Sequence, residues 1–229
     1  MNNDEDGILF LVSTPIGNLD DMTKRAVDTL KKSDIIACED TRRTARLLKR
    51  YGIDKPLESY HDHNKEKKTP YFLKLLGKGK MISLVSDSGT PCISDPGFYL
   101  VKNTIEKGFR LLPLPGASAL LSALIVSGLA TDRFVFEGFL PKKKGRRGKR
   151  LEQLKEEERT IILFESPFRL LSLLTGLYEI FGDRKASISR ELTKMYEETI
   201  RGTLSELITH FSNKKPKGEF VIVVEGAKR

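Results

Sequence analysis

The apolar residues of the first half of the chain fall into short continuous runs separated by stretches with helical spacing. The runs, bounded by Ser, Thr, Pro or Gly, predict buried strands at 8–12, 35–38, 57–60, 81–86 and 110–112. The spaced stretches between them predict helices over 22–32, 41–51, 64–76 and 96–107. This alternation of strands and helices with short loops predicts a mostly parallel α/β sheet.

The pattern of apolar residues changes in the second half of the chain. After a helix of small residues over 117–127, strand-like runs return at 133–137, 160–165, 185–189, 197–202 and 219–224. Helices are expected near 149–158, 166–180 and 204–211. Several connections are too short for parallel crossovers, so a mixed sheet is expected. We therefore predict two α/β domains, 1–115 and 116–229, with the boundary near 113–117.

The net charge of the chain bears on the kind of partner that it binds. There are 40 Lys and Arg against 31 Asp and Glu in 229 residues, a formal net charge of +9. Such an excess favours a polyanionic partner, because each phosphate contact releases counterions. The start is acidic and polar, and no apolar stretch is long enough to span a membrane, so a cytoplasmic protein is expected. Cys38 and Cys92 form no C-x-x-C pair, which favours a reducing compartment.

Three loops that follow predicted strands carry the candidate chemistry: 13–19, 87–97 and 114–119. The second combines small residues with two acids and two prolines, so its backbone can approach a ligand closely. Its end, 95–96, also suits a helix start. The first loop lacks G-x-G-x-x-G, so a phosphate-cradling dinucleotide site is not supported. The third is a tight turn into small residues, which suits a flat ring or close helix–sheet packing.

The motifs TPIGNL, CEDTRRT, SDSGTPCISDPG, LPGASA, FEGFLP, FESPFRL and GEFVIVVEG follow one another along the chain. They resemble the S-adenosylmethionine-dependent tetrapyrrole methylase superfamily and, within it, the ribosomal RNA small-subunit methyltransferase I family, over about residues 8–226. The resemblance implies two α/β domains of the tetrapyrrole methylase type with the cofactor in the interdomain cleft. It also implies methylation of the ribose 2′-hydroxyl of a cytidine in the decoding region of 16S ribosomal RNA. A homodimer acting on the assembled small ribosomal subunit is implied as well.

The same resemblance assigns the cofactor contacts. The residues expected to bind S-adenosylmethionine are Pro15, Asp87, Gly89, Thr90, Ile93, Ser94, Ser118, Ala119, Phe164, Glu191, Gly218 and Glu219. Relatives that act on tetrapyrroles carry a glycine-rich first loop, of which only Gly17 remains here, and this departure favours the RNA branch. Two other positions depart from the family pattern. Lys65 stands where a glutamate is usual, which puts a substrate role there in doubt, and Ser88 stands where alanine is common.

Basic and polar side chains are the candidate RNA contacts. They are Arg42, Arg43, Asn64, Lys142, Lys143, Lys144, Arg146, Arg147, Lys149 and Arg150. The basic run 142–150 is expected to be a flexible loop, because two glycines interrupt it. Such a run attracts phosphates without reading sequence, and its plain alternative is a solvated loop. Arg42 and Arg43 suit phosphate, with a local pair to Asp40 as the alternative.

A general base would help methylation, because a ribose hydroxyl is a weak acid. The candidates are Asp40, Glu39, His61 and Glu165. Glu39 and Asp40 end a strand at the expected ligand edge, although either can instead pair with a neighbouring arginine. His61, His63 and Asn64 resemble half of a metal site, but no partner ligands follow at suitable spacing, so no metal is expected.

Two other functions fit parts of the sequence. A different enzyme of the same superfamily would methylate a tetrapyrrole or a protein side chain, and the basic run argues against it. A non-enzymatic RNA-binding or ribosome-assembly protein would use the basic run but would not need the small-residue loops.

Overall fold

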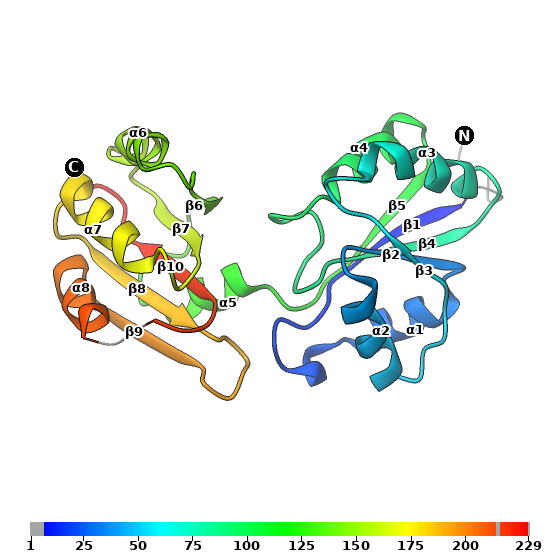
Figure 1. Cartoon of the computed structure of the whole chain (residues 1–229), viewed down its shortest axis with the longest axis horizontal. Coiled ribbons are helices and arrows are strands. Elements are labelled where there is room, and N and C mark those ends of the chain that lie inside the picture. Colours follow the sequence, from blue (N-terminus) through cyan, green and yellow to red (C-terminus); the bar gives the residue numbers. More distant parts are fainter. Residues whose placement is uncertain (1–6, 214–215, 229) are drawn as a thin grey trace. The chain divides into compact units, whose positions relative to one another are not determined.

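The computed structural model describes residues 7–213 and 216–228. The chain divides into two compact units, Met1–Ser118 and Ala119–Arg229, each built on one sheet (Figure 1). Among the described helices, none is long and apolar enough to cross a membrane.

The first unit is a parallel sheet with the strand order β3-β2-β4-β1-β5. Its strands are β1 (Ile8–Val12), β2 (Ile35–Cys38), β3 (Leu57–Ser59), β4 (Met81–Val85) and β5 (Arg110–Leu114). Its helices are η1 (Leu19–Asp21), α1 (Lys24–Lys32), α2 (Thr41–Arg50), α3 (Lys65–Leu76) and α4 (Phe98–Glu106). The predicted parallel sheet is confirmed. β5 continues through Pro113, beyond its predicted end, because an edge strand tolerates a residue without an N–H.

The two faces of this sheet carry different helices. Val12 lies in one apolar cluster with residues of α1 and with Leu48 of α2. Leu9 lies in another cluster with Phe72 of α3 and Leu100 of α4. The connections after β1 and β2 therefore cover one face, and those after β3 and β4 cover the other. Because β1 and β4 are neighbours, this is a topological switch point, where open α/β sheets bind ligands at the carboxyl edge.

The second unit is a mixed sheet with the strand order β6-β7-β10-β8-β9. Its strands are β6 (Phe134–Phe139), β7 (Thr160–Glu165), β8 (Lys185–Arg190), β9 (Glu198–Thr203) and β10 (Phe220–Val224). Its helices are α5 (Ala119–Val126), α6 (Lys144–Leu154), α7 (Leu170–Phe181) and α8 (Leu204–Ser212). β6 and β7 are parallel, and the other described pairs are antiparallel. The predicted mixed sheet is confirmed.

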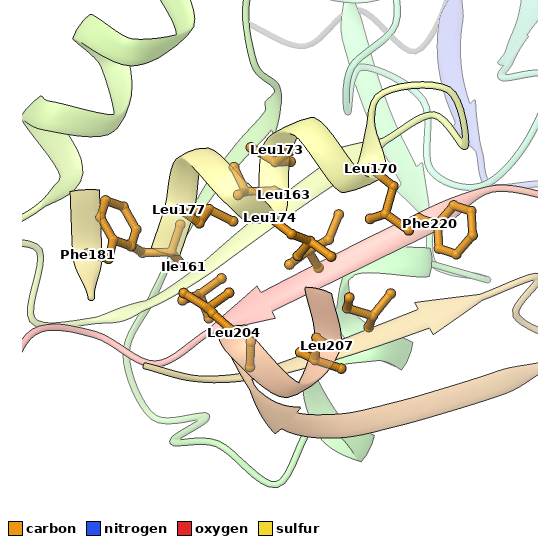
Figure 2. Close-up of a cluster of buried hydrophobic side chains, with 14 of the residues drawn as sticks. Ile161, Leu163, Leu170, Leu173, Leu174, Leu177, Phe181, Leu204, Leu207 and Phe220 are labelled. Carbon is orange, nitrogen blue, oxygen red and sulfur yellow. The ribbon is translucent and has the colours of Figure 1, made fainter. Parts of the chain in front are cut away.

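Leucines of three helices form the main core of this unit. Figure 2 shows Leu174 and Leu177 of α7, Leu207 of α8 and Ile161 of β7 in this one cluster. Leu151 of α6 completes the contact from a third helix. α5 packs against β10. Because Leu151 packs into this core, α6 and the part of the basic run that it contains are held firmly against the second unit.

The basic run 142–150 is mostly helical, which corrects the prediction of a flexible loop. α6 begins at Lys144, and Gly145 and Gly148 lie inside it. Glycine disfavours a helix by only about 1 kcal/mol relative to alanine. Burial of Leu151 and Leu154 in the core of the second unit outweighs that cost, because tertiary packing supplies most helix stability.

Gly148→Ala is expected to stabilise the protein by about 0.5–1 kcal/mol, because alanine is the better helix former. A Cβ at Gly148 would meet no atom within 4 Å, so the change adds no clash. Urea unfolding followed by circular dichroism measures the gain. Gly182→Ala is the contrasting variant, since Gly182 has a φ of +77° and should lose stability. Equal stability of Gly148→Ala and the parent would contradict a helical basic run.

Candidate functional site

Two of the candidate loops are joined at the switch point between β1 and β4. The backbones of Thr14 and Gly89 exchange two hydrogen bonds, with N–O distances of 2.9 and 3.1 Å. Gly89 has a φ of +84°, which glycine adopts without strain. A Cβ there would lie 3.2 Å from Cγ2 of Ile16. The loops 13–19 and 87–97 therefore approach each other backbone to backbone.

The third loop, 114–119, joins the other two through hydroxyl groups. Thr90 Oγ1 donates to the carbonyl of Ala117 at 3.2 Å and lies 3.3 Å from Ser13 Oγ, which donates to it. A Cβ at Gly116 would lie 2.8 Å from Cβ of Ser13, so this approach requires glycine. The structure thus brings together three loops of the first unit that lie far apart in the sequence.

The loop after β4 has an uncommon backbone conformation. Cys92 and Ser94 have φ values of +71° and +62°, in a region that few residues other than glycine occupy. Asp95 Oδ1 holds this loop by accepting from the backbone N–H of Cys92 at 2.7 Å and of Gly97 at 2.8 Å. Asp95 Oδ2 is buried and has no hydrogen-bond partner. A buried acceptor without a donor is costly, so this oxygen is suited to a polar ligand.

Sequence reasoning missed Asp95, which it treated as part of a helix start. α4 begins later, at Phe98. The motif offered a hint, since two acids in a small-residue loop exceed what one helix cap needs. The unpartnered oxygen, however, is visible only in three dimensions.

Asp87 connects the loop after β4 to helix α2. Its Oδ1 accepts from the backbone N–H of Asp40 at 3.0 Å, and its Oδ2 lies 3.3 Å from the guanidinium of Arg43. The Asp40 carboxylate caps α2 by accepting from the backbone N–H groups of Arg42 and Arg43. It also accepts from the Arg42 side chain, and these hydrogen bonds hold the pKa of Asp40 at about 2. The local pair of Asp40 with Arg42 is therefore present.

Glu39 stands in a different environment at the end of β2. Its side chain reaches solvent. Desolvation raises its pKa, and the nearby carboxylates of Asp87 and Asp95 raise it further. At the carboxyl edge of a sheet, an ionised acid whose pKa is raised is a stronger base than an ordinary glutamate.

His61 and Asn64 are occupied by contacts within the turn after β3. Asn64 Oδ1 accepts from the backbone N–H of His61 at 2.9 Å, and its Nδ2 donates to the carbonyl of Ser59 at 3.1 Å. Asn64 Nδ2 also lies 3.1 Å from His61 Nε2, while His61 Nδ1 is buried without a partner. Within residues 7–213 and 216–228, no cluster of His, Cys, Asp or Glu is arranged to hold a metal.

In the second unit, three predicted cofactor residues lie together where β8 ends and β10 begins. The backbone N–H of Glu219 donates to Glu191 Oε1 at 2.9 Å. Gly218 has a φ of +98°, and a Cβ there would lie 2.5 Å from Cγ of Glu191. Lys194, which sequence reasoning missed, pairs with Glu191 at 3.0 Å and Glu219 at 2.9 Å. Phe164 lies on β7, directly beside β10.

The basic run divides into exposed and anchored side chains. The exposed cations are Lys142, Lys143, Lys144, Arg146 and Lys149. Arg147 is only 7% exposed and donates to Ser172 Oγ of α7 at 2.6 Å. Arg150 forms a bidentate ion pair with Glu137 of β6, in which Nη2 donates to Oε1 at 2.7 Å and Nε donates to Oε2 at 2.8 Å. Two of the predicted RNA contacts, Arg147 and Arg150, therefore attach α6 to the rest of the unit. The sequence alone does not distinguish these two arginines from the exposed cations beside them.

The chain is similar to known methylases along nearly its whole length. A family model described as Tetrapyrrole (Corrin/Porphyrin) Methylases matches residues 9–208. The ribosomal RNA small subunit methyltransferase I of Synechocystis sp. is 54% identical over 222 residues, which are 96% of this chain and 80% of that protein. The Bacillus subtilis protein of the same name is 52% identical, covering 96% and 76%. The Thermotoga maritima one is 50% identical, covering 96% and 99%.

Solved structures share the fold at much lower identity. A cobalt precorrin-4 methyltransferase superposes with a TM-score of 0.69 at 16% identity, covering 98% of this chain and 97% of that one. Diphthine synthase superposes with a TM-score of 0.71 at 14% identity, covering 96% and 90%. At such identity the likeness concerns the fold alone.

Proposed function

We propose that this chain, which belongs to the tetrapyrrole methylase family and within it to the ribosomal RNA small subunit methyltransferase I proteins, methylates 16S ribosomal RNA with S-adenosylmethionine. The observation that carries the proposal is identity of 50% or more over 96% of the chain to several proteins of that name. The acceptor we propose is the ribose 2′-hydroxyl of a cytidine in the decoding region.

The loops of the first unit fit S-adenosylmethionine. At Gly89 and Gly116 the loops pack so closely that a Cβ would press on the side chains of Ile16 and Ser13. The buried Asp95 Oδ2 lacks a donor, and the cofactor carries both amino and hydroxyl donors. The residues proposed to hold it are Pro15, Asp87, Gly89, Thr90, Ile93, Ser94, Asp95 and Ser118 in the first unit, and Ala119, Phe164, Glu191, Gly218 and Glu219 in the second. When bound, it supplies an electrophilic methyl group on a sulfonium centre.

The protein's part in the reaction is to orient the ribose hydroxyl and to take its proton. Orientation of this kind can lower a barrier by roughly 7–11 kcal/mol. We propose Glu39 as the base, because it reaches solvent at the carboxyl edge and its pKa is raised.

The other candidate bases have competing roles. Asp40 is a weak base, since its pKa is held at about 2, its Oδ1 caps α2 and its Oδ2 accepts from the Arg42 side chain. His61 Nε2 contacts Asn64, and its Nδ1 is enclosed. Glu165 has a fully buried side chain paired with Arg169 at 2.6 Å. These contacts support Glu39 over the three alternatives.

The proposed phosphate contacts are the exposed cations. They are Arg42, Arg43, Lys142, Lys143, Lys144, Arg146 and Lys149. Asn64, Arg147 and Arg150 are left out of the proposal, because their side chains are engaged within the protein and none of the three residues is exposed. Arg42 and Arg43 pair with acids but remain exposed. Exposed cations of this kind attach to the RNA backbone without reading its sequence.

Asp87→Ala is expected to weaken S-adenosylmethionine binding by roughly 10- to 100-fold, because it removes a charged acceptor that ties the loop to α2. Calorimetric titration with S-adenosylmethionine and S-adenosylhomocysteine measures the change. Asp87→Asn keeps an acceptor for the Asp40 N–H and should lose less. If the folded parent binds neither compound, with or without RNA present, the non-enzymatic RNA-binding function is the better account.

Transfer of labelled methyl groups tests the substrate. Small ribosomal subunits, free 16S RNA and a porphyrin precursor are offered in parallel, the RNA coming from cells that lack this methylation. We expect label in the RNA, and a 2′-O-methyl group is located because it blocks alkaline cleavage of the adjacent phosphodiester. Label in the porphyrin instead would favour a tetrapyrrole methylase.

We further propose that the enzyme works in the cytoplasm as a homodimer on the assembled small subunit. An enzyme that modifies ribosomal RNA works in the compartment where ribosomes are built. Light scattering of the purified chain tests the dimer, and the ratio of rates on the subunit and on free RNA tests the form of the substrate.

A further inference from the structure

Two phenylalanines are exposed at one edge of the second sheet. Phe139 ends β6 and is 56% exposed, and Phe168, in the turn between β7 and α7, is 90% exposed. β6 and β7 are parallel neighbours, so both residues lie at the carboxyl edge. Arg169 Nη1 donates to the carbonyl of Leu140 at 3.3 Å, which holds the two turns against each other. Exposing an aromatic ring this far forgoes the stabilisation that burial would give.

The protein holds both positions in place. Phe139 packs edge-to-face on Phe164, with ring centroids 5.6 Å apart, and Phe164 packs likewise on Phe136 at 4.9 Å. The turn that carries Phe168 is anchored by the pair of Arg169 with the buried Glu165. The rings are therefore presented by a fixed scaffold, which lowers the entropy lost when a ligand binds.

The charge around these rings fits RNA. Lys142, Lys143 and Lys144 follow Phe139 almost directly in the chain, and all three are exposed. The first turn of α6 holds no acidic residue. Sites for single-stranded nucleic acids combine a basic surface with aromatic rings on which bases stack. A double helix keeps its base faces hidden, so this combination favours an unpaired strand.

We propose that Phe168 and Phe139 stack on unpaired nucleobases of the RNA substrate while Lys142, Lys143 and Lys144 bind the adjoining phosphates. The inference rests on the proposed function for the presence of an RNA substrate. It adds that the segment of RNA bound by the second unit is single-stranded and that its bases make the contact.

The test uses the full chain and a labelled single-stranded RNA of about twelve nucleotides, beside a duplex of the same length. Phe168→Ala should weaken binding of the single strand by roughly 5- to 100-fold and leave the duplex unchanged. Phe168→Trp should retain the affinity, because the larger ring also stacks. Tyr178→Ala is the matched control, since Tyr178 is an exposed aromatic residue on α7. It should bind as the parent does.

The salt dependence separates stacking from charge. Phe168→Ala should keep the slope of log affinity against log salt, whereas Lys143→Ala should reduce it by about 0.7. Unchanged affinity in Phe168→Ala overturns the inference, as does an equal loss for single strand and duplex. So does a change in oligomeric mass, which would mean that the rings contact a second copy of the chain.

The failure of this inference is distinguishable from failure of the proposed function. If Phe168→Ala binds single strands normally while the parent methylates ribosomal RNA, only the stacking inference fails. If Phe168→Ala weakens binding of the single strand but the parent transfers no methyl group to RNA, the stacking inference holds and the proposed function fails.

Discussion

Glu39→Gln is expected to slow methyl transfer to RNA by roughly 10²- to 10⁴-fold while S-adenosylmethionine affinity stays close to that of the parent. The amide keeps the size of the side chain but cannot accept the proton of the ribose hydroxyl. The effect should appear in single-turnover transfer, where product release does not mask the chemical step.

The pH dependence gives the same prediction an independent readout. Glu39 acts as its carboxylate, so the rate should fall as the pH drops through its pKa. Since desolvation and the carboxylates of Asp87 and Asp95 raise that pKa, the fall should begin above the usual range of a glutamate. The Gln variant should lack this fall.

Asp40→Asn is the matched control for the Glu39 variant. Asparagine also caps helices, so α2 should remain intact and the rate should change little. A Glu39→Gln enzyme that transfers methyl groups at the parent's rate would remove Glu39 from the mechanism.

Arg169→Ala is expected to destabilise the second unit by about 3–5 kcal/mol. The Glu165 side chain is completely buried, and Arg169 lies 2.6 Å from its Oε1. Oε2 of Glu165 already has no hydrogen-bond partner. Removing the guanidinium leaves a buried carboxylate without a counter-ion and also breaks the hydrogen bond to the Leu140 carbonyl.

Urea unfolding followed by far-UV circular dichroism measures this loss, because the chain has no tryptophan to report by fluorescence. The double variant Glu165→Met, Arg169→Met should lose less than Arg169→Ala alone, since neither charge remains buried. Arg190→Ala serves as the control, because its pair with Glu198 is partly exposed and should contribute about 1 kcal/mol or less. A loss of that small size in Arg169→Ala would contradict the predicted role of the pair.

Local pattern is reliable where a segment has one strong physical preference. The apolar runs of β1, β2 and β7 were predicted with the bounds that the structure has, because such runs are buried on both faces and end at polar residues. The basic run is the opposite case. Its glycines and lysines indicated a loop, and the packing of Leu151 and Leu154 made it a helix.

The candidate site shows the same division. Motifs placed the three loops at strand ends, but they could not say which strands are neighbours. Only the order β3-β2-β4-β1-β5 puts the loop of Gly89 against that of Thr14. Likewise, the neighbouring acids Glu39 and Asp40 look equivalent in sequence. Desolvation and the distant carboxylates of Asp87 and Asp95 raise the pKa of Glu39, whereas hydrogen bonds from the neighbouring Arg42 lower that of Asp40.

The sequence by itself determined the α/β class, the positions of most strands and the family, because each depends on local spacing or on motifs read in order. The tertiary structure decided which of two neighbouring acids has a raised pKa, which cations of the basic run face solvent and where two exposed aromatic rings stand. Those properties arise from contacts between residues far apart in the chain, such as Asp87 with Arg43 and Arg147 with Ser172. No local pattern encodes such contacts, because they follow from how whole strands and helices pack.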